Sequence, residues 1–361
     1  MTVYGSARES KIYILVTTVF LYAGGTLSQK VQVHFHGATV LSWKVAGKDV
    51  LFQSREAIYD NQAPIRAGIP IAFPHFGQWE AGPTHGFART SRWKLEEGPQ
   101  KDSNGNATVV YSLVDTEETR RLWNHKFKLT YTLVFGDTAF KTTLNGRAAD
   151  LRTTSAGTAG TVARERLGLA PLTVTANCPY CGYRTEVTDL YKGHVEQICR
   201  LQYLSKILSR MALCFIKVKN TGDTTFNFTT LLHNYFRVDD ISAVTVSGMQ
   251  GLEYIDKTRN FERFTESREL LTVGEFVDSI YINTPSSHVI TGINGGRTLR
   301  MDKENFPDTV VWNPWETMSP NFPDLGNDEY LSFICVEAGH VVNPVTLTPG
   351  EEFTAVQLLT L

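Results

Sequence analysis

Alternating apolar and polar residues along most of the chain predict a series of short β-strands. Residues 31–52, VQVHFHGATVLSWKVAGKDVLF, alternate in this way and carry glycines where turns are expected. Residues 127–145, FKLTYTLVFGDTAFKTTLN, predict two strands joined through Phe135-Gly136-Asp137. The same pattern continues in residues 224–238, 243–249, 286–293, 298–303, 308–315, 330–339 and 353–361. Short strands with frequent turns and almost no amphipathic helix favour an all-β fold, a large antiparallel β-sandwich or barrel.

The region 146–217 departs from this pattern and predicts an insertion in the β domain. It begins with a stretch that is poor in aromatic residues and rich in Ala, Gly, Thr and Arg. Removing the region joins Asn145 to Val218 and gives strict alternation across the junction. A strand split in this way favours an artefact of gene modelling, such as a translated intron, over a true surface insertion, because tolerated insertions normally lie in turns.

The N-terminal residues 1–29 have no clear assignment. Residues 12–23, IYILVTTVFLYA, form an apolar run that is too short to span a bilayer but has the length of a signal-peptide core. An acidic residue before the run counts against export, and its Val, Ile, Tyr and Phe content equally predicts a buried strand. Residues 11–29 could also be a second foreign piece. We therefore expect one β domain over residues 30–361, interrupted by the insertion.

The composition is that of a globular protein. The 361 residues are 42% hydrophobic and 20% charged, with a formal net charge of −2. No overall basic field therefore points to nucleic acid or to an acidic membrane surface as a partner. Five cysteines, an odd number in a chain of this length, favour reduced thiols and a cytoplasmic location over a disulfide framework. Without a conspicuous interface signature, we expect a monomer.

Cysteine and histidine clusters offer weak metal or redox signals. Four of the five cysteines lie in the region 146–217, and its last part, 193–217, predicts an amphipathic helix. The candidates for a redox dithiol or a zinc site are Cys178, Cys181, Cys199, Cys214 and His194. No βαβ core surrounds the CxxC pair and the later residues are loosely spaced, so we expect no metal. His34 and His36 share a strand face, and we expect hydrogen-bonded structural histidines there.

Three stretches carry candidate catalytic or binding residues. Residues 65–93 form a long segment interrupted by Gly and Pro, and such loops in a β domain are usually functional. Its basic side chains are Arg66, His75, His85, Arg89 and Arg92. Two of these arginines could clamp a phosphate, because a planar guanidinium matches phosphate oxygens. His233 lies in an apolar run, LLHNYF, where core packing is the simpler interpretation. Glu337 is either exposed on its strand or buried with a shifted pKa.

Together these stretches resemble the aldose 1-epimerase (galactose mutarotase-like) superfamily, and most closely its hexose-6-phosphate branch, the glucose-6-phosphate 1-epimerases. The matching pieces run in family order: HGATVLSWK (36–44), DVLFQS (49–54), IRAGIPIAFPHFG (65–77), HGFAR (85–89), LLHNYFRVDDI (231–241), DTVVWNPW (308–315) and CVEAGHV (335–341). The pieces RAGIP and HGFAR distinguish this branch from plain galactose mutarotases. The resemblance implies the large antiparallel β-sandwich of that superfamily, the supersandwich.

The resemblance also implies roles for five residues. His233 matches the catalytic histidine and Glu337 the catalytic carboxylate, while Arg66 and Arg89 match arginines that bind the phosphate. Asp278 matches an aspartate that binds sugar hydroxyls, on a weaker local match. The implied reaction interconverts the α and β anomers of a hexose 6-phosphate by acid–base ring opening, without metal, nucleotide or covalent intermediate.

Two departures from the family pattern leave alternatives open. Thr84 stands where the family often has Gln, and residues 317–324, TMSPNFPD, are irregular where an acidic, Gly-containing loop is usual. One alternative is a sandwich that binds sugar phosphates without turnover, and another is an epimerase of unphosphorylated sugars. A third is a chain that cannot fold stably as written, because the insertion interrupts a strand ladder.

Overall fold

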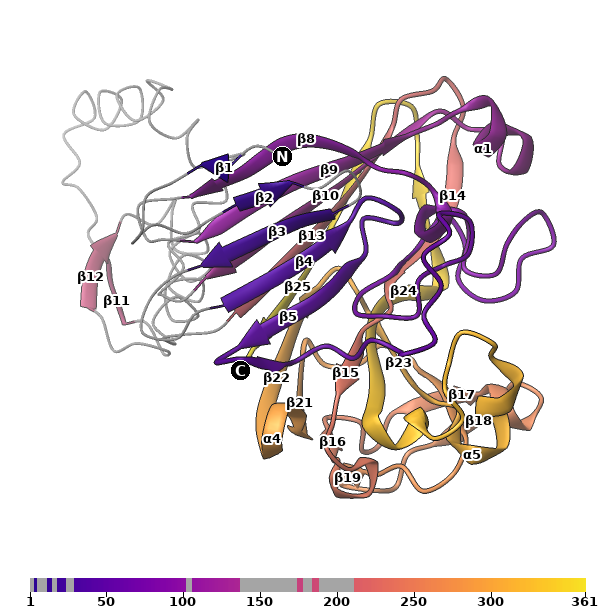
Figure 1. Ribbon diagram of the computed structural model, residues 1–361. Coiled ribbons are helices and arrows are strands. Elements are labelled where there is room, and N and C mark those ends of the chain that lie inside the picture. Colours follow the sequence, from indigo (N-terminus) through magenta and orange to yellow (C-terminus); the bar gives the residue numbers. More distant parts are fainter. Residues whose placement is uncertain are drawn as a thin grey trace. The chain divides into compact units, whose positions relative to one another are not determined.

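The structure is a computed structural model that describes residues 3–4, 12–14, 18–23, 29–101, 106–136, 174–177, 184–187 and 211–361. The chain divides into two units, Met1–Asp137 together with Arg210–Leu361, and Thr138–Ser209. In the second unit, β11 (Val174–Asn177) pairs antiparallel with β12 (Arg184–Val187). Every pairing between strands in these described ranges is antiparallel, as the alternation predicted (Figure 1).

Three sheets build the first unit. The largest has nine strands in the order β19-β16-β21-β22-β25-β13-β10-β9-β8. Their bounds are β19 Leu270–Leu271, β16 Val246–Ser247, β21 Ser287–Gly292, β22 Arg297–Glu304, β25 Glu352–Thr360, β13 Met211–Asn220, β10 Phe127–Gly136, β9 Ala107–Val114 and β8 Lys94–Lys101. Along β10 the inward residues are buried and Lys128 is exposed, which is the period of two that the sequence shows.

The second sheet has eight strands in the order β18-β17-β20-β23-β24-β14-β7, with the short β15 also paired to β24. Their bounds are β18 Glu262–Thr265, β17 Glu253–Asp256, β20 Val277–Tyr281, β23 Asp308–Asn313, β24 Phe333–Leu347, β14 Phe226–Leu232, β7 Ile71–Ala72 and β15 Tyr235–Arg237. β23 is buried along its whole length, and so is the first half of β24. Polar residues in these strands are therefore held inside the protein.

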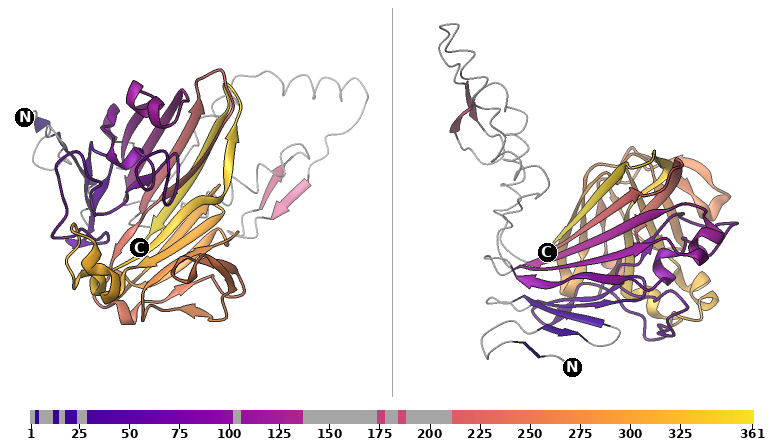
Figure 2. Two further views of the ribbon diagram at one scale, coloured as in Figure 1. Left: turned by 90° about the vertical axis from the view of Figure 1, so that its right-hand side faces the viewer. Right: turned by 90° about the horizontal axis from the view of Figure 1, so that it is seen from above.

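The third sheet, in the order β1 to β6, comes from the N-terminal part of the chain. Its bounds are β1 Val3–Tyr4, β2 Ile12–Ile14, β3 Thr18–Ala23, β4 Gln29–His34, β5 Val40–Val45 and β6 Lys48–Asp49. The views show β3, β4 and β5 as a layer beside β9 and β10 (Figures 1 and 2).

Short helices connect the strands: α1 Glu117–Leu122, α4 Ile293–Gly296 and α5 Trp315–Met318, with 3-10 helices η1 Ala88–Thr90, η4 Ile241–Ala243, η5 Lys257–Arg259, η6 Ser319–Asn321 and η7 Glu329–Ser332. In the part of the chain that the structure describes, no helix is long and apolar enough to cross a membrane.

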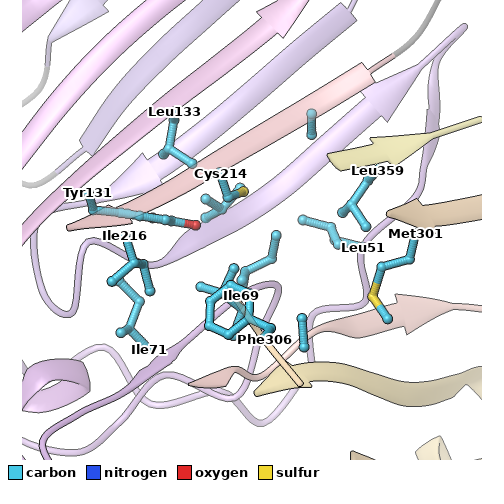
Figure 3. Close-up of a cluster of buried hydrophobic side chains, with 14 of the residues drawn as sticks. Leu51, Ile69, Ile71, Tyr131, Leu133, Cys214, Ile216, Met301, Phe306 and Leu359 are labelled. Atoms are coloured by element: carbon cyan, nitrogen blue, oxygen red, sulfur yellow. The ribbon is translucent and has the colours of Figure 1, made fainter. Parts of the chain in front are cut away.

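One connected hydrophobic core joins the three sheets. It contains Trp43 from the N-terminal sheet, Tyr131 and Ile216 from the nine-stranded sheet, and Phe228 and Val336 from the eight-stranded sheet, all almost fully buried. Figure 3 shows the region of this core around Tyr131, Cys214 and Leu359. Burial on this scale supplies the main stabilisation of a β-sandwich, and it leaves the eight-stranded sheet as a rigid support for polar side chains.

The strand that follows the insertion differs from the predicted one. β13 pairs with β10 over ten residues, from Phe127 opposite Asn220 to Gly136 opposite Met211. Residues 211–217 therefore belong to a sandwich strand, and the prediction that they end an amphipathic helix is wrong. The remainder of that predicted helix lies outside the described residues. Alternation alone could not find this strand, because residues 211–216, MALCFI, form a continuous apolar run, whereas residues 139–145 alternate.

The strand pairing places the insertion at a connection between β10 and β13. Because Gly136 and Met211 are opposite each other, the intervening segment connects two strands of one antiparallel pair. A hairpin connection is a position where insertions are tolerated. The interruption therefore lies at a connection between two strands, and a foreign origin of the segment stays a prediction.

The N-terminal apolar run contains strand in its described residues. β3 pairs with β4 over six residues, from Thr18 opposite His34 to Ala23 opposite Gln29. Of the two interpretations of residues 12–23, the structure agrees with a strand.

The cysteine and histidine candidates have simple environments where the structure describes them. Cys214 is fully buried in the core, and burial raises its pKa to about 12. Cys178, Cys181, Cys199 and His194 lie outside the described residues. His36 donates its backbone N–H to His34 Nδ1 at 3.1 Å, and its own Nε2 lies 2.9 Å from the Ala63 carbonyl oxygen. These contacts agree with structural histidines.

Candidate active site

Strand register brings His233 and Glu337 together. Glu337 lies on β24, in the stretch from Phe333 to Gly339 that is buried on both faces. On one side β23 places Val310 opposite Glu337, and on the other β14 places Leu232 opposite Ala338. His233 directly follows Leu232, so the antiparallel register puts it beside Glu337. Of the two environments predicted for Glu337, the buried one is confirmed, with 1% of the residue exposed.

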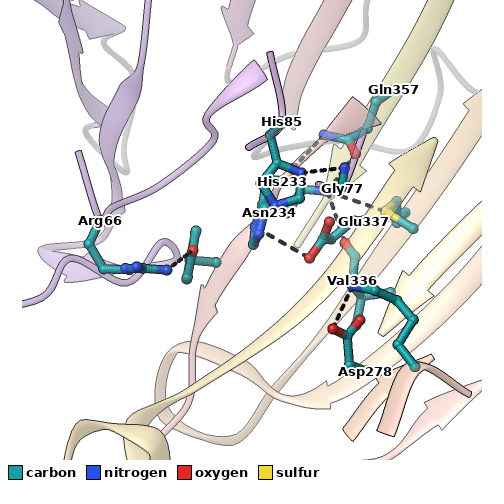
Figure 4. A network of polar contacts seen from close by, with 12 residues as sticks. Arg66, Gly77, His85, His233, Asn234, Asp278, Val336, Glu337 and Gln357 are labelled. Atoms are coloured by element: carbon teal, nitrogen blue, oxygen red, sulfur yellow. Dashed lines mark hydrogen bonds and ion pairs between the residues drawn. The ribbon is translucent and has the colours of Figure 1, made fainter. Parts of the chain in front are cut away.

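The imidazole of His233 lies close to the carboxylate of Glu337 (Figure 4). Its Nδ1 lies 3.3 Å from Glu337 Oε1, but the angles do not make a hydrogen bond. The ring stacks on Tyr235 at 4.6 Å with an interplanar angle of 8°, and it meets His85 and Trp312 edge-on. Stacking fixes the plane of the ring while both carboxylate oxygens remain without a hydrogen-bond partner.

Asn234 anchors the backbone between His233 and Tyr235. Its Nδ2 donates to the Val336 carbonyl at 2.9 Å and to Gln357 Oε1 at 2.7 Å, and Gln357 donates back to Asn234 Oδ1 at 3.0 Å. All of these groups are buried, and a fully satisfied buried network is rigid. His233 and Tyr235 therefore leave the backbone from a fixed point.

Burial sets the direction of both pKa shifts in the pair. Desolvation raises the pKa of Glu337 well above its usual range, and the negative charge of Asp278 adds to this shift. Desolvation likewise lowers the pKa of His233 well below its usual range, and the nearby charges of Arg89 and Arg66 lower it further. Both groups are therefore driven towards their neutral forms.

Arg66 is already engaged by an acidic partner. Its Nη2 and Nε donate to the two carboxylate oxygens of Asp324 at 2.9 and 3.2 Å, and its Nη1 donates to the Tyr235 hydroxyl at 3.0 Å. The guanidinium also lies over the Phe322 ring at 4.8 Å. The irregular stretch 317–324 thus supplies Asp324 to the site. The sequence analysis did not select this residue.

Arg89 has free donor capacity. It lies in η1, donates from Nη2 to the Thr84 carbonyl at 2.7 Å, and has a buried Nε without a hydrogen-bond partner. Burial lowers its pKa to about 10, which leaves it charged near neutral pH. The contact uses the backbone of Thr84, so the replacement of a family Gln by Thr does not affect it.

Asp278 is paired with a lysine that the sequence analysis did not select. Lys257 Nζ lies 2.6 Å from Asp278 Oδ2. The register explains the contact, because β17 and β20 place Asp256 opposite Ser279 and so bring the next residue, Lys257, beside Asp278. Desolvation raises the pKa of Asp278, and Lys257 opposes this shift. No local pattern around Lys257 in the sequence points to this position.

His85 also lies in the site, although the family resemblance implies no role for it. Its Nδ1 accepts the Gly77 backbone N–H at 3.1 Å, so a neutral ring carries its proton on Nε2. Desolvation lowers its pKa well below the usual value. The left-handed backbone at His85, with φ of 66°, turns the loop so that the ring meets His233 edge-on.

All five predicted residues share one electrostatic neighbourhood. Asp278 and Arg89 both shift the pKa of Glu337, and Arg89 and Arg66 both shift that of His233. The other basic residues of the long loop are placed differently, since His75 stacks on Trp79 and Arg92 lies over the Phe35 ring.

The same site contains donor atoms that could hold a metal ion. Ligand atoms of His233, Cys335 and Glu337 lie within 4.8 Å of one another.

A separate cavity of about 680 Å³ contains none of the predicted site residues. Its lining includes Lys44 paired with Asp49 and Arg55 paired with Asp328. These charges satisfy one another, so this cavity is a weaker candidate for acid–base chemistry.

The sequence model of the aldose 1-epimerase family matches residues 26–160 and 211–360. The chain belongs to the aldose 1-epimerase family. A protein of Cenchrus ciliaris, provisionally named glucose-6-phosphate 1-epimerase, is 29% identical over 326 residues, which cover 89% of this chain and 78% of the relative. An Escherichia coli K12 protein with the same provisional name is 26% identical over 314 residues, covering 86% and 80%.

Solved structures show the same fold. The crystal structure of a provisionally named mutarotase from Salmonella typhimurium has a TM-score of 0.67 at 23% identity and covers 97% of this chain and 92% of its own. Galactose 1-epimerase from Lactobacillus acidophilus has a TM-score of 0.58 at 12% identity, covering 99% and 97%. The family match confirms the predicted superfamily, and these structures confirm the predicted antiparallel β-sandwich. The chain is thereby placed among the carbohydrate epimerases.

Proposed function

We propose that this protein interconverts the α and β anomers of a hexose 6-phosphate, with Glu337 and His233 as the acid–base pair. Glu337 as carboxylate removes the proton from the anomeric O1 while His233 as imidazolium protonates the ring oxygen O5, and the C1–O5 bond breaks. The open-chain aldehyde then rotates about C1–C2. The reverse transfers close the ring on the other face of C1.

The observation that carries this proposal is the close, buried pair itself, 3.3 Å apart. Burial favours a neutral carboxylic acid and a neutral imidazole, which is the protonation state that the pair has after ring opening. That state is complementary to the open-chain sugar, since the acid can return a proton to O1 and the imidazole can accept the O5 proton. Catalysis requires such preferential stabilisation of the species along the reaction over the bound cyclic sugar.

Two cations support a phosphorylated substrate. Arg89 has an unpartnered buried Nε, and a phosphate oxygen is a suitable acceptor for it. We assign Arg89 as the principal phosphate ligand and Arg66 as a second one, with Asp278 and Lys257 binding sugar hydroxyls. The provisional glucose-6-phosphate 1-epimerase names of the two relatives agree with this assignment.

One observation favours an unphosphorylated aldose as the alternative substrate. Arg66 donates to Asp324 and Tyr235 through three of its nitrogens. If that arrangement persists with sugar bound, Arg66 neutralises Asp324 and does not bind phosphate.

Anomer exchange measured by NMR magnetisation transfer tests the proposal. Glucose 6-phosphate, glucose and galactose are compared with the purified protein, and we expect acceleration for the phosphorylated sugar. His233→Ala and Glu337→Gln should each lose about 10²- to 10⁴-fold, whereas His125→Ala and Glu118→Gln on other surfaces should retain the rate. A folded protein that accelerates only free galactose exchange would move the assignment to unphosphorylated aldoses. No acceleration of any sugar would support a binding protein without turnover.

A further inference from the structure

Three different ligand atoms, two of them from the proposed acid–base pair, lie close together. Cys335 and Glu337 are two residues apart on β24 and therefore project from the same face of the strand. His233 follows the neighbouring strand β14, and the nitrogen, sulfur and oxygen donors all lie within 4.8 Å of one another. Cys335 and Glu337 are essentially unexposed, and His233 is 8% exposed.

The polar atoms of this cluster lack partners. His233 Nδ1 and both carboxylate oxygens of Glu337 are buried without a hydrogen bond. Buried polar atoms are normally paired, and those that are not point to a function or to a missing ligand. The unpaired atoms face one another across the 3.3 Å contact, so a single small species could satisfy them together.

We propose that His233, Cys335 and Glu337 form a binding site for Zn²⁺, and that the bound ion blocks the proposed epimerase reaction. One nitrogen, one thiolate sulfur and one carboxylate oxygen are donors that zinc accepts, and three protein ligands leave the fourth tetrahedral position for water. Zinc–ligand bonds of about 2.0 to 2.3 Å place tetrahedral donors about 3.4 to 3.6 Å apart. The cluster would contract by about 1 Å at its widest separation to reach that geometry.

The charges of the cluster balance on binding. The Cys335 thiol loses its proton, and Glu337 binds as carboxylate, so two negative ligands offset the dication. The neighbouring cations Arg89 and Lys257, whose charges act on Glu337, then face a neutral group. Zinc and catalysis are mutually exclusive because the metal occupies both the carboxylate and the imidazole that move protons. This inhibition rests on the proposed function, whereas metal binding does not.

Cobalt(II) is the probe for binding, because a thiolate ligand gives it a charge-transfer absorption band. The titration uses metal-free full-length protein in which Cys178, Cys181 and Cys199 are replaced by serine, which leaves Cys214 and Cys335. We expect one Co²⁺ per chain, a thiolate band, and displacement by one equivalent of Zn²⁺. Adding Cys335→Ala should abolish the band, and His233→Ala should weaken binding at least tenfold. Far-UV circular dichroism and the melting temperature show whether each variant is folded.

A band that persists in the folded Cys335→Ala variant, or no band in the starting protein, would overturn the site. Inhibition is measured separately, as the zinc concentration that halves anomer exchange relative to each variant's own rate without zinc. Cys335→Ala should raise that concentration at least tenfold. If Co²⁺ binds but no sugar is turned over, the proposed function fails and the metal site stands. If turnover is present and zinc binds without slowing it, the inhibitory part is wrong.

Discussion

At the scale of single residues, His233 and Glu337 share protons in a dry environment, and this determines the pH dependence of the proposed reaction. In the reactive state, His233 and Glu337 together hold one exchangeable proton, either on the imidazole or on the carboxylate. The pair gains a second when His233 becomes protonated, at a pKa that is lowered, and it loses its last when Glu337 ionises, at a pKa that is raised. We therefore expect a bell-shaped profile of kcat/KM, whose two apparent pKa values belong to the pair rather than to either residue.

Lys257 provides a test of that assignment. Its positive charge lowers the pKa of both Glu337 and His233. Lys257→Met should therefore raise both pKa values and move the whole bell towards higher pH, and the measurement is kcat/KM for anomer exchange against pH. Lys257→Arg keeps the charge and should leave the profile near its original position. A profile that Lys257→Met does not move would show that the pair is insulated from this cation.

The two arginines should differ in their effect on substrate affinity. Arg89 has an unpartnered Nε, whereas Arg66 is engaged by Asp324 and Tyr235. A hydrogen bond to a charged group contributes about 1.5 to 3 kcal/mol. Arg89→Met should thus raise KM for glucose 6-phosphate by about 10- to 150-fold, and Arg66→Met should raise it less.

Steady-state kinetics with glucose 6-phosphate and glucose separates a phosphate contact from general damage to the site. Loss of a phosphate ligand should raise KM for glucose 6-phosphate far more than KM for glucose, and because both arginines also shift the pKa of His233, each variant is measured at its own pH optimum. A larger effect for Arg66→Met than for Arg89→Met would mean that the substrate displaces Asp324.

At the scale of strands, hydrophobic packing behind the site should dominate stability. Phe228 on β14 is buried and packs against Phe73, Phe226 and Phe353. Phe228→Ala should lower the free energy of unfolding by about 3 to 5 kcal/mol, because the lost contacts leave a cavity. Phe261 is 64% exposed, so Phe261→Ala should change the free energy of unfolding little. Urea denaturation measures both, and equal effects would contradict this picture of the core.

The sequence predicts the strands better than it predicts how they pair and in which order they lie in a sheet. Alternation identified β4, β10, β22 and β25 because one side of each strand faces the core. It could not give the order β20-β23-β24-β14, which depends on pairings between distant parts of the chain. For the same reason Lys257 and Asp324 were not predicted as site residues, since each reaches the site through non-local packing.

The assigned roles came from a different kind of information. Residue types and spacing identified His233 and Glu337 only as candidates, and the family resemblance supplied the role of each. The boundary at residue 211 shows the limit of periodicity, because the alternating residues 139–145 and the uniformly apolar residues 211–216 are both compatible with this strand position. Sequence patterns cannot resolve such a tie, whereas the relative stability of the two alternatives can.

At the scale of the whole molecule, two deletions of the insertion compare the stability of the two possible strands. Deleting residues 138–209 leaves Asp137 and Arg210 as a two-residue connection between Gly136 and Met211, which lie opposite each other in the sheet. Two residues are sufficient for a β-hairpin, and an Asn-Gly pair at these positions suits the turn. The deletion retains Cys214 and Ile216, which are both fully buried in the core. We expect this shortened chain to be soluble and to unfold cooperatively.

The matched variant deletes residues 146–217 and joins Asn145 to Val218. In that chain Phe140, Thr142 and Leu144 would take the strand positions that Ala212, Cys214 and Ile216 now occupy. Phe140 would then place an aromatic ring at the buried position of Ala212, and overpacking a core position costs about 1 to 3 kcal/mol. We therefore expect the 138–209 deletion to have the higher free energy of unfolding in urea. If the 146–217 deletion is instead the more stable, residues 139–145 are the native strand, and the segment from 146 to 217 is foreign to the sandwich.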